Sequence, residues 1–411
     1  MSTSIKILQI NATYGDGSTG TIVKDIHEMC LESGMEAYVV YASTSLCAKD
    51  IQNGYRIGNA FSNKLHALFT RVNGRQANFS FFPTFALLRH ISKIKPDIVH
   101  LHNLHSNYIH FGLLLSFLAK KEIPTVITLH DCWFFTGGCF HYTSSQCKKW
   151  MDKCGNCPRK KMDFPAYFLD KSSSVLNERK RFFDKIQNLN IVGCSQWIVS
   201  ECQKGIFKGR NCTTIYNGID LSIFKHRDSQ LKNLLGLEGK YIILGPASKW
   251  LAPINKEVLD YVVQNLDESS VLLLYGCSSK YHNMSDKVKT IGFIKDKLEL
   301  ACIYSIADVF VNCSREDTLP TVNLEAQACG LPVVAFANTG ATETINEKCG
   351  YKIPTGRADL LMQAINKLKS LHQNEKDNIR VSCRDWIKAK FEKENNYQKY
   401  LDLYRKIISS K

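Results

Sequence analysis

"SREDTLPTVNLEAQACGLPVV", residues 314–334, contains the change from a buried strand to a helix and back to a strand. An apolar run at 308–314 precedes it, Leu319-Pro320 forms a turn, and a helix is expected to start near Thr321. Cys329-Gly330 then ends this helix, as glycine often does, before the apolar run at 332–337. A strand, a helix and a strand in this order predict parallel strands joined by a right-handed crossover.

The same alternation continues from end to end. Short β-branched and apolar runs predict strands within residues 5–11, 36–43, 97–102, 125–131 and 190–195, and again within 241–248, 270–276, 288–294, 308–314 and 332–337. Helical patterns such as residues 21–34 lie between them. The sequence therefore predicts an α/β protein of two Rossmann-like doubly wound domains facing across a cleft.

The length of 411 residues also favours two domains. The turn at Asn217-Gly218 and the polar stretch after it place the boundary, so we expect domains at 1–222 and 223–385. Residues 386–411 predict one long amphipathic helix that packs back across the domains. Its apolar side chains near one face are Trp386, Phe391, Tyr397, Leu401, Tyr404 and Ile408.

Composition is that of a globular protein, with 44% hydrophobic and 22% charged residues. The start "MSTSIKILQIN" does not resemble a signal peptide, and the longest apolar run, "HFGLLLSFLAKK", suits a buried helix, so a cytosolic protein is expected. The net charge is +15. It fits a solvated surface, an anionic membrane or anionic substrates, and nucleic acid less well because Arg and aromatic residues are not interleaved.

Ligands of doubly wound sheets bind beyond the carboxyl ends of the strands. After the first strand, Gly15, Gly17, Ser18, Thr19 and Gly20 form a turn that opens a helix and suits a phosphate, or is a plain strand–helix turn. Its spacing is not G-x-G-x-x-G, so a nicotinamide cofactor is not expected.

Histidines end two later strands of the first half, at His100 and His102 and at His130-Asp131. Imidazoles at this edge can bind sugar hydroxyls or hold a proton, although a single histidine is more often structural. His102 is the stronger candidate, and His130 beside Asp131 is the next.

In the second half, Lys249 or Lys256 could neutralise a diphosphate, or be ordinary surface lysines. The loop "IGFIKD", with Gly292 and Ile294, could lie beside a nucleobase. Asp317 and Glu325 are predicted to face one crevice, where carboxylates accept hydrogen bonds from sugar hydroxyls, unless they merely complement the helix dipole.

These residues resemble the retaining glycosyltransferase family 4 of the GT-B fold. The pattern acid-x7-Glu-Ala-x-Ala-x-Gly-x-Pro-Val-Val carries the resemblance, together with the glycine turn, "PDIVHLHNLH", "TLHD", "IYNGIDLSIF" and "IGFIKDKLELACIYSIADVFVNCS". The insert "HDCWFFTGGCFHY" with its later cysteines resembles the branch that builds bacterial capsule, colanic-acid-like and O-antigen polysaccharides.

The resemblance implies roles for residues that match the family's motifs. It implies that Glu325 binds the donor ribose, that Asp317, with Glu316 beside it, holds the donor sugar, and that His102 lies by the reacting centre. It places Lys256 on the diphosphate of a UDP- or GDP-sugar. The other residues implied at the donor are Gly17, Ser18, Thr19, Gly20, Thr318, Leu319 and Pro320.

Three positions depart from the family pattern. Asp317 replaces the usual Glu, Asn255 stands where the branch usually has Arg, and Glu257 stands where it has Gly. Lys249 could offset the loss of the Arg. The resemblance also implies attack on the face from which the diphosphate leaves, without a metal at the reacting centre. It implies a lipid-linked saccharide acceptor at the inner face of an anionic cell membrane, with His130 and Asp131 on the acceptor side.

The chain has 16 cysteines, and four of them, Cys139, Cys147, Cys154 and Cys157, lie within 19 residues. In a reducing compartment this density predicts a structural Zn²⁺ site in a Cys-rich insert at about 132–160, with His141 as an alternative ligand, or else free thiols.

Two alternatives to the glycosyltransferase remain open at this stage. One is a basic, zinc-containing binding protein on an inactive GT-B scaffold, which the Asn255 departure favours. The other is a nucleotide-sugar epimerase, for which the sequence offers no evident proton-abstracting carboxylates.

Overall fold

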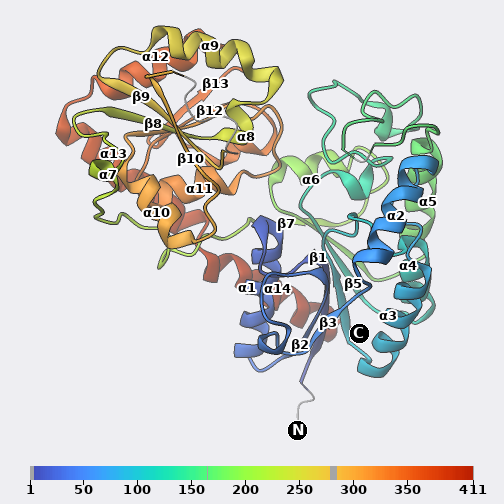
Figure 1. Cartoon of the computed structure of the whole chain (residues 1–411). Helices are drawn as coiled ribbons and strands as arrows, with labels where there is room; N and C mark the ends of the chain where they lie inside the picture. The colour runs from blue at the N-terminus through green and yellow to red at the C-terminus, as the bar shows by residue number, and fades with distance from the viewer. Residues whose placement is uncertain (1–3, 164, 278–284, 411) are drawn as a thin grey trace. The chain divides into compact units, whose positions relative to one another are not determined.

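The computed structural model describes residues 4–163, 165–277 and 285–410. The chain forms two compact units, the first from Met1–Tyr216 with Tyr397–Lys411 and the second from Asn217–Asn396 (Figure 1). Both units are parallel sheets wound with helices, so the predicted α/β class is confirmed.

The first unit has a seven-stranded parallel sheet in the order β3-β2-β1-β4-β5-β6-β7. The strands are β1 (Lys6–Thr13), β2 (Glu36–Ser43), β3 (Gly54–Arg56), β4 (Ile98–Leu101), β5 (Thr125–Leu129), β6 (Leu189–Gly193) and β7 (Cys212–Thr214). The helices are α1 (Gly17–Glu32), α2 (Ala60–Asn73), α3 (Phe81–Ile94), α4 (Phe111–Lys120), α5 (Ser172–Asp184) and α6 (Gln196–Cys202). Apolar side chains of β1, β4, β5 and α1 meet in its buried core.

The second unit repeats the design with six parallel strands in the order β10-β9-β8-β11-β12-β13. They are β8 (Tyr241–Pro246), β9 (Ser270–Tyr275), β10 (Val288–Ile291), β11 (Val309–Asn312), β12 (Val333–Phe336) and β13 (Gly350–Ile353). The helices are α7 (Leu231–Leu234), α8 (Ala247–Trp250), α9 (Lys256–Asn265), α10 (Lys297–Ile306), α11 (Thr321–Ala328), α12 (Ala358–Lys369) and α13 (Gln373–Lys390).

Residues 308–337 fold as predicted, since β11, α11 and β12 follow one another and the two strands pair in parallel. α11 starts at Thr321, and Gly330 follows it with a left-handed φ of 82°, which explains the glycine at this helix end.

The single C-terminal helix predicted at 386–411 is wrong, because the chain breaks between α13 and α14 (Lys393–Ser409). At the break, the Ile219 N–H donates to the Phe391 carbonyl and the Lys393 N–H donates to the Ile219 carbonyl. A Cβ on Gly218 would lie 2.4 Å from the Lys393 Cα, so the Asn217-Gly218 turn packs directly against this break. Backbone pairing with residue 219 thus replaces helical hydrogen bonds.

The residues of α14 beyond the break belong to the first unit. Tyr397, Tyr400, Leu401, Tyr404 and Ile407 are buried in its core. Among the described residues no helix combines the length and apolarity needed to cross a bilayer.

Candidate active site

The strand orders define where each unit can bind a ligand. In both sheets the chain reverses its direction of winding between two central strands, β1 and β4 in the first and β8 and β11 in the second. Ligands of such sheets bind beyond the carboxyl ends of the strands at this switch point. The loops after β8 and β11 are therefore the candidate donor site of the second unit.

A buried polar network holds the loop after β11. The Asn312 amide donates to Oδ1 of Asn323 at 2.9 Å, and the Asn323 amide donates to Oγ1 of Thr344 at 3.0 Å. The Ser314 N–H donates to Oδ1 of Asn312 at 3.0 Å. Buried and satisfied side-chain networks of this kind hold one conformation, so the loop is fixed by α11 and by residue 344.

Asp317 lies in this loop, as predicted, and shapes it. Its Oδ1 accepts the Leu319 N–H at 3.2 Å, while its backbone N–H donates to Oγ1 of Thr339 at 3.1 Å. Glu316 precedes it, with its carbonyl accepting the Ser314 hydroxyl. The predicted loop residues Thr318, Leu319 and Pro320 are buried.

Glu325 lies on the second turn of α11, as the sequence predicts. The Tyr304 hydroxyl donates to its Oε2 at 3.1 Å, and the Tyr275 hydroxyl lies 3.2 Å from that of Tyr304. Burial raises the pKa of Glu325, and the hydrogen bond from Tyr304 opposes this rise. Since Glu325 accepts from Tyr304, the Tyr304 oxygen can accept from Tyr275, and the three side chains form one directed chain.

The Arg315 side chain lies beside Asn255, the position at which the family pattern has an Arg and this chain does not. Asn255 is buried at the start of α9, and its amide donates to the carbonyls of Lys249 and Cys313 at 3.0 and 2.9 Å. Nε of Arg315 donates to Oδ1 of Asn255 at 2.9 Å, and Nη2 donates to the Ile254 carbonyl. Arg315 thus connects the loops after β8 and β11, which is the switch point itself.

The other predicted donor residues are spread over the second unit. Lys256 is on the surface of α9, where it forms an ion pair with Asp260 one turn later. Gly292 and Ile294 follow the edge strand β10, with the Gly292 carbonyl accepting the Gly276 N–H at 3.1 Å. Lys249 is half-buried beside Asn255.

In the first unit, the predicted histidines come together at the ends of the neighbouring strands β4 and β5. Nδ1 of His102 lies 3.0 Å from Nε2 of His130, and Nε2 of His102 lies 3.1 Å from Oε1 of Gln9. The Gln9 amide nitrogen donates to the Val23 carbonyl, so Oε1 must accept from His102. His102 therefore carries its proton on Nε2, and His130 must donate from its own Nε2.

Both rings are neutral in this arrangement. Burial lowers the pKa of His102 well below its usual value, and neighbouring imidazoles lower it further. Burial likewise lowers the pKa of His130 to about 4, against an opposing effect of Asp131. These imidazoles can exchange hydrogen bonds with hydroxyl groups but are poor proton stores near neutral pH.

The Asp131 carboxylate is ionised and accepts two hydrogen bonds. Burial opposes the charge, but hydrogen bonds from His105, at 3.1 Å, and from the Trp133 N–H, at 2.8 Å, bring the pKa below its ordinary value. Behind them, His100 contacts the hydroxyls of Tyr404 and Thr128 at 2.6 and 2.7 Å.

The glycine turn opens α1 at Gly17. Gly15 and Gly17 have left-handed φ angles of 77° and 66°, and a Cβ on Gly20 would lie 2.7 Å from Oγ1 of Thr13. Oγ1 of Thr19 accepts from the Asn103 amide, so the turn and the loop after β4 are joined, while Ser18 is exposed.

The predicted zinc site has no support in this structure. Cys139, Cys147, Cys154 and Cys157 line one pocket, but in the part of the chain that the structure describes no three His, Cys, Asp or Glu side chains could hold a metal ion. Burial raises the pKa of Cys139 to about 12 and of Cys154 to about 11.

Aromatic packing and a buried cation hold this segment instead. Trp133 and Trp150 are buried, and the Arg179 guanidinium stacks 3.7 Å from the Trp133 ring centroid while donating to the carbonyls of Trp133 and Thr136. Arg159 pairs with Asp163 at 3.2 Å.

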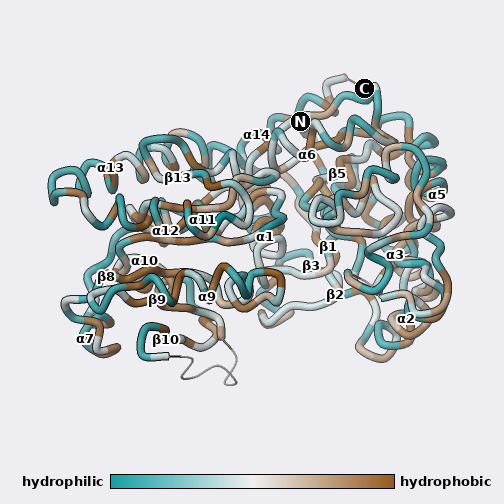
Figure 2. Tube along the Cα trace, turned by 90° about the horizontal axis from the view of Figure 1, so that it is seen from above, coloured by the Kyte–Doolittle hydropathy of each residue, from teal (hydrophilic) through white to brown (hydrophobic). Residues whose placement is uncertain are grey.

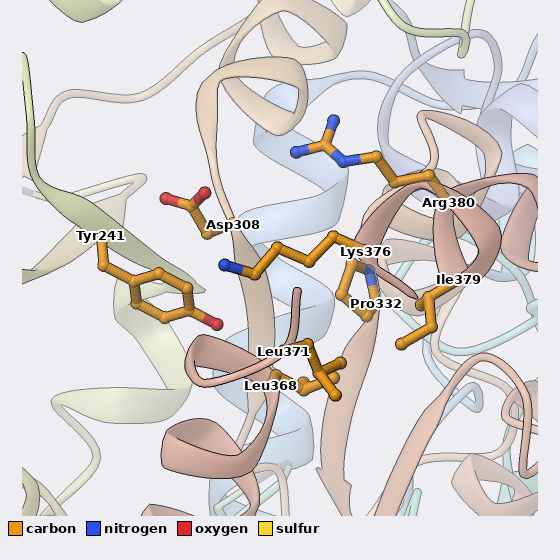
Figure 3. Close-up of a pocket in the computed structure, with 8 residues that line it drawn as sticks. All are labelled: Tyr241, Asp308, Pro332, Leu368, Leu371, Lys376, Ile379 and Arg380. Carbon is orange, nitrogen blue, oxygen red and sulfur yellow. The ribbon is translucent and has the colours of Figure 1, made fainter. Parts of the chain in front are cut away.

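A pocket in the second unit lies at the amino ends of its strands, opposite to the candidate donor site. Tyr241, Asp308 and Pro332 come from the amino ends of β8, β11 and β12, and Figure 3 shows the Lys376 ammonium pointing toward the first two. Because it lies away from the carboxyl ends of the strands, we do not assign it to the donor.

Comparisons with known proteins agree with the fold and the order of these motifs. Residues 20–223 match the family described as Glycosyltransferase Family 4, and residues 257–386 match Glycosyl transferases group 1. The putative colanic acid biosynthesis glycosyl transferase WcaC of Escherichia coli K12 is 24% identical over 364 residues, covering 85% of this chain and 87% of that protein.

Solved structures share the fold over nearly the whole chain. A glycosyltransferase from Rickettsia africae superposes with a TM-score of 0.70 at 17% identity, covering 99% of this chain and 100% of that one. Anabaena HepE in complex with UDP-glucose superposes with a TM-score of 0.66 at 15% identity, with the same coverage.

The protein is therefore a GT-B glycosyltransferase. Its amino-terminal domain belongs to Glycosyltransferase Family 4 and its carboxyl-terminal domain to Glycosyl transferases group 1.

Proposed function

We propose that the protein transfers a sugar from a UDP- or GDP-sugar to a saccharide acceptor during synthesis of a cell-surface polysaccharide. The observation that carries the proposal is the Tyr275–Tyr304–Glu325 chain beside the Asn255–Arg315 pair at the switch point of the second unit. The similarity to WcaC supports a polysaccharide product, and an acceptor on a lipid carrier at an anionic membrane fits the basic chain.

Each part of the donor is matched by a chemical group. The Glu325 carboxylate accepts hydrogen bonds from the ribose hydroxyls, and Tyr304 holds it in place. Arg315 and Lys249 neutralise the diphosphate, and Arg315 supplies the positive charge that the family's usual Arg would carry at position 255. Asp317 and Glu316 hold the transferred sugar through the loop that Thr339 anchors.

The transfer proceeds with retention of the anomeric configuration. The acceptor oxygen forms its bond to the anomeric carbon on the face from which the diphosphate leaves, and the bond from that carbon to the phosphate oxygen breaks. The acceptor proton passes to the departing phosphate, giving a glycoside and a nucleoside diphosphate. Positioning and charge neutralisation lower the barrier, and no metal is required at the reacting centre.

Neutral His102 and His130 complete the proposal. They orient hydroxyl groups of the transferred sugar and the acceptor, with Asp131 fixing the loop that carries His130. In the first unit, the turn at Gly17–Gly20 offers backbone N–H groups to an anionic group.

A thermal-shift series with UDP, GDP, ADP and their sugars tests the proposal. A ligand at about 100 times its dissociation constant stabilises the native protein by ~2.7 kcal/mol. Stabilisation by one base identifies the donor class, and the same donor must then be consumed with a lipid-linked saccharide. A chain that responds to none of them is an inactive GT-B scaffold, and the proposal fails.

A further inference from the structure

Exposed apolar side chains concentrate on one part of the first unit. Nineteen large apolar side chains are exposed among the described residues, and eight of them lie in 61–85 and four in 162–169. We call the surface that these side chains form the α2–α3 face. It consists of Phe61, Leu65, Leu68, Phe69 and Val72 of α2, Phe81, Phe82 and Phe85 of α3, and Tyr167, Phe168 and Leu169.

These segments adjoin one another. The Tyr167 N–H donates to the Arg71 carbonyl at 2.8 Å, and a Cβ on Gly74 would lie 2.4 Å from the Leu169 carbonyl, so the loop covers the end of α2. His66 of α2 contacts the Ser80 hydroxyl at 2.6 Å, which holds the start of α3 against α2. Figure 1 shows α2 and α3 at the periphery of their unit, and Figure 2 shows apolar colouring there.

The polarity of α2 is the reverse of that in an ordinary surface helix. Its buried side chains are His66 and Thr70, which are polar, while its apolar residues point outward. At 3.6 residues per turn, the five apolar side chains of α2 fall within about 100° of its circumference. An outward apolar stripe of this width is typical of a helix that lies in a membrane interface.

Charge indicates what the face binds. Residues 51–96 contain seven Lys or Arg and no Asp or Glu. Six of these cations are exposed, namely Arg56, Lys64, Arg71, Arg89, Lys93 and Lys95. Arg89 and Lys93 continue the helical stripe of Phe82 and Phe85 along α3.

We infer that the α2–α3 face docks on an anionic lipid bilayer. Phe61, Phe82 and Phe168, which are 76%, 87% and 72% exposed, enter the interface between headgroups and acyl chains, and the cations contact lipid phosphates. The inference deepens the proposed function by naming its membrane-binding surface, and it rests on that function only for the lipid-linked acceptor.

Vesicle flotation of the full-length protein tests the inference without any donor or acceptor. We expect binding to vesicles of phosphatidylcholine with 30% phosphatidylglycerol and little binding to phosphatidylcholine alone. The double variant Phe61→Ser/Phe82→Ser should bind about tenfold more weakly for each Phe removed. The matched control Leu234→Ser/Val381→Ser, which removes two exposed side chains of α7 and α13, should bind like the wild type.

Three outcomes would overturn the inference. They are no binding to anionic vesicles, an equal loss of binding in the control variant, and a dimer in light scattering that the double Phe variant converts to a monomer. Thermal shift with nucleotides on the same variants separates the two proposals. A double Phe variant that binds vesicles as tightly as the wild type, with an intact donor response, refutes only the docking surface, and a wild type that binds vesicles but responds to no nucleotide refutes only the transfer reaction.

Discussion

The Tyr304 hydroxyl donates a hydrogen bond to Oε2 of Glu325 over 3.1 Å, linking α10 to α11 beside the donor site. This bond fixes one oxygen of a carboxylate that burial would otherwise push toward protonation. The bond therefore keeps Glu325 both oriented and closer to its charged form, which is the form that binds ribose hydroxyls best.

Tyr304→Phe tests this relationship, because it removes the hydroxyl and keeps the ring that packs against Phe310. We expect the affinity for the nucleotide to fall about tenfold, since the carboxylate loses a charge-assisted hydrogen bond. Titration calorimetry with the stabilising nucleotide measures it. An unchanged affinity would show that Tyr304 is only a packing residue.

Glu325→Gln should separate stability from binding. The folded pKa of Glu325 is raised, so its ionised form costs stability at pH values above that pKa, and the cost disappears as the pH falls through it toward the unfolded value of about 4.3. The variant should therefore melt higher than wild type at pH 7.5 and equally near pH 4.5. Its nucleotide affinity should be about tenfold to a hundredfold lower.

Arg315→Ala tests the replacement cation. Because Arg315 is proposed to contact the diphosphate, the variant should lose about tenfold or more in affinity for the nucleoside diphosphate and nothing for the nucleoside. Arg357→Ala, which removes an exposed Arg paired with Asp359 in the same unit, is the matched control. Equal losses for nucleoside and diphosphate would contradict the assigned role.

The sequence predicts the fold well, because buried parallel strands are continuous apolar runs. All ten predicted strands are present. The three strands it missed, β3, β7 and β13, have only three or four residues and lie at the edges of the two sheets, where the apolar pattern is weakest.

The candidate site is harder to predict, since its partners are distant in sequence. Asn255 signalled a missing cation, but only the structure shows that Arg315, 60 positions later, bonds to it. The position of Arg315 directly before Glu316 was the available signal. Tyr304 gave no signal, because a Tyr in an apolar helix matches an ordinary core position, whereas Gln9, a polar residue within an apolar strand, was a signal that the sequence did offer.

Buried neutral histidines should make the first unit sensitive to acid. Burial lowers the pKa of His66 to about 4, where its Nε2 accepts the Asn78 N–H at 3.2 Å. The unfolded chain takes up a proton near pH 6.5, so stability is lost as the pH falls from there toward 4, by about 1.4 kcal/mol per pH unit for each such group.

The pH dependence of urea unfolding measures this loss. His66→Gln should unfold with a shallower dependence between pH 6.5 and 4.5, whatever its stability at pH 8. The control His226→Gln removes an exposed histidine and should leave the slope unchanged. Identical slopes for the wild type and the His66 variant would refute the prediction.

Tyr404 should stabilise the first unit from the end of the chain. Its hydroxyl lies 2.6 Å from Nδ1 of His100, and both side chains are buried. Tyr404→Phe leaves that ring nitrogen without its partner and should lower the free energy of unfolding by about 1–3 kcal/mol. Tyr38→Phe, whose hydroxyl donates to the half-exposed Glu36, is the control and should change stability little. A Tyr404→Phe variant as stable as this control would mean that α14 is held by its apolar side chains alone.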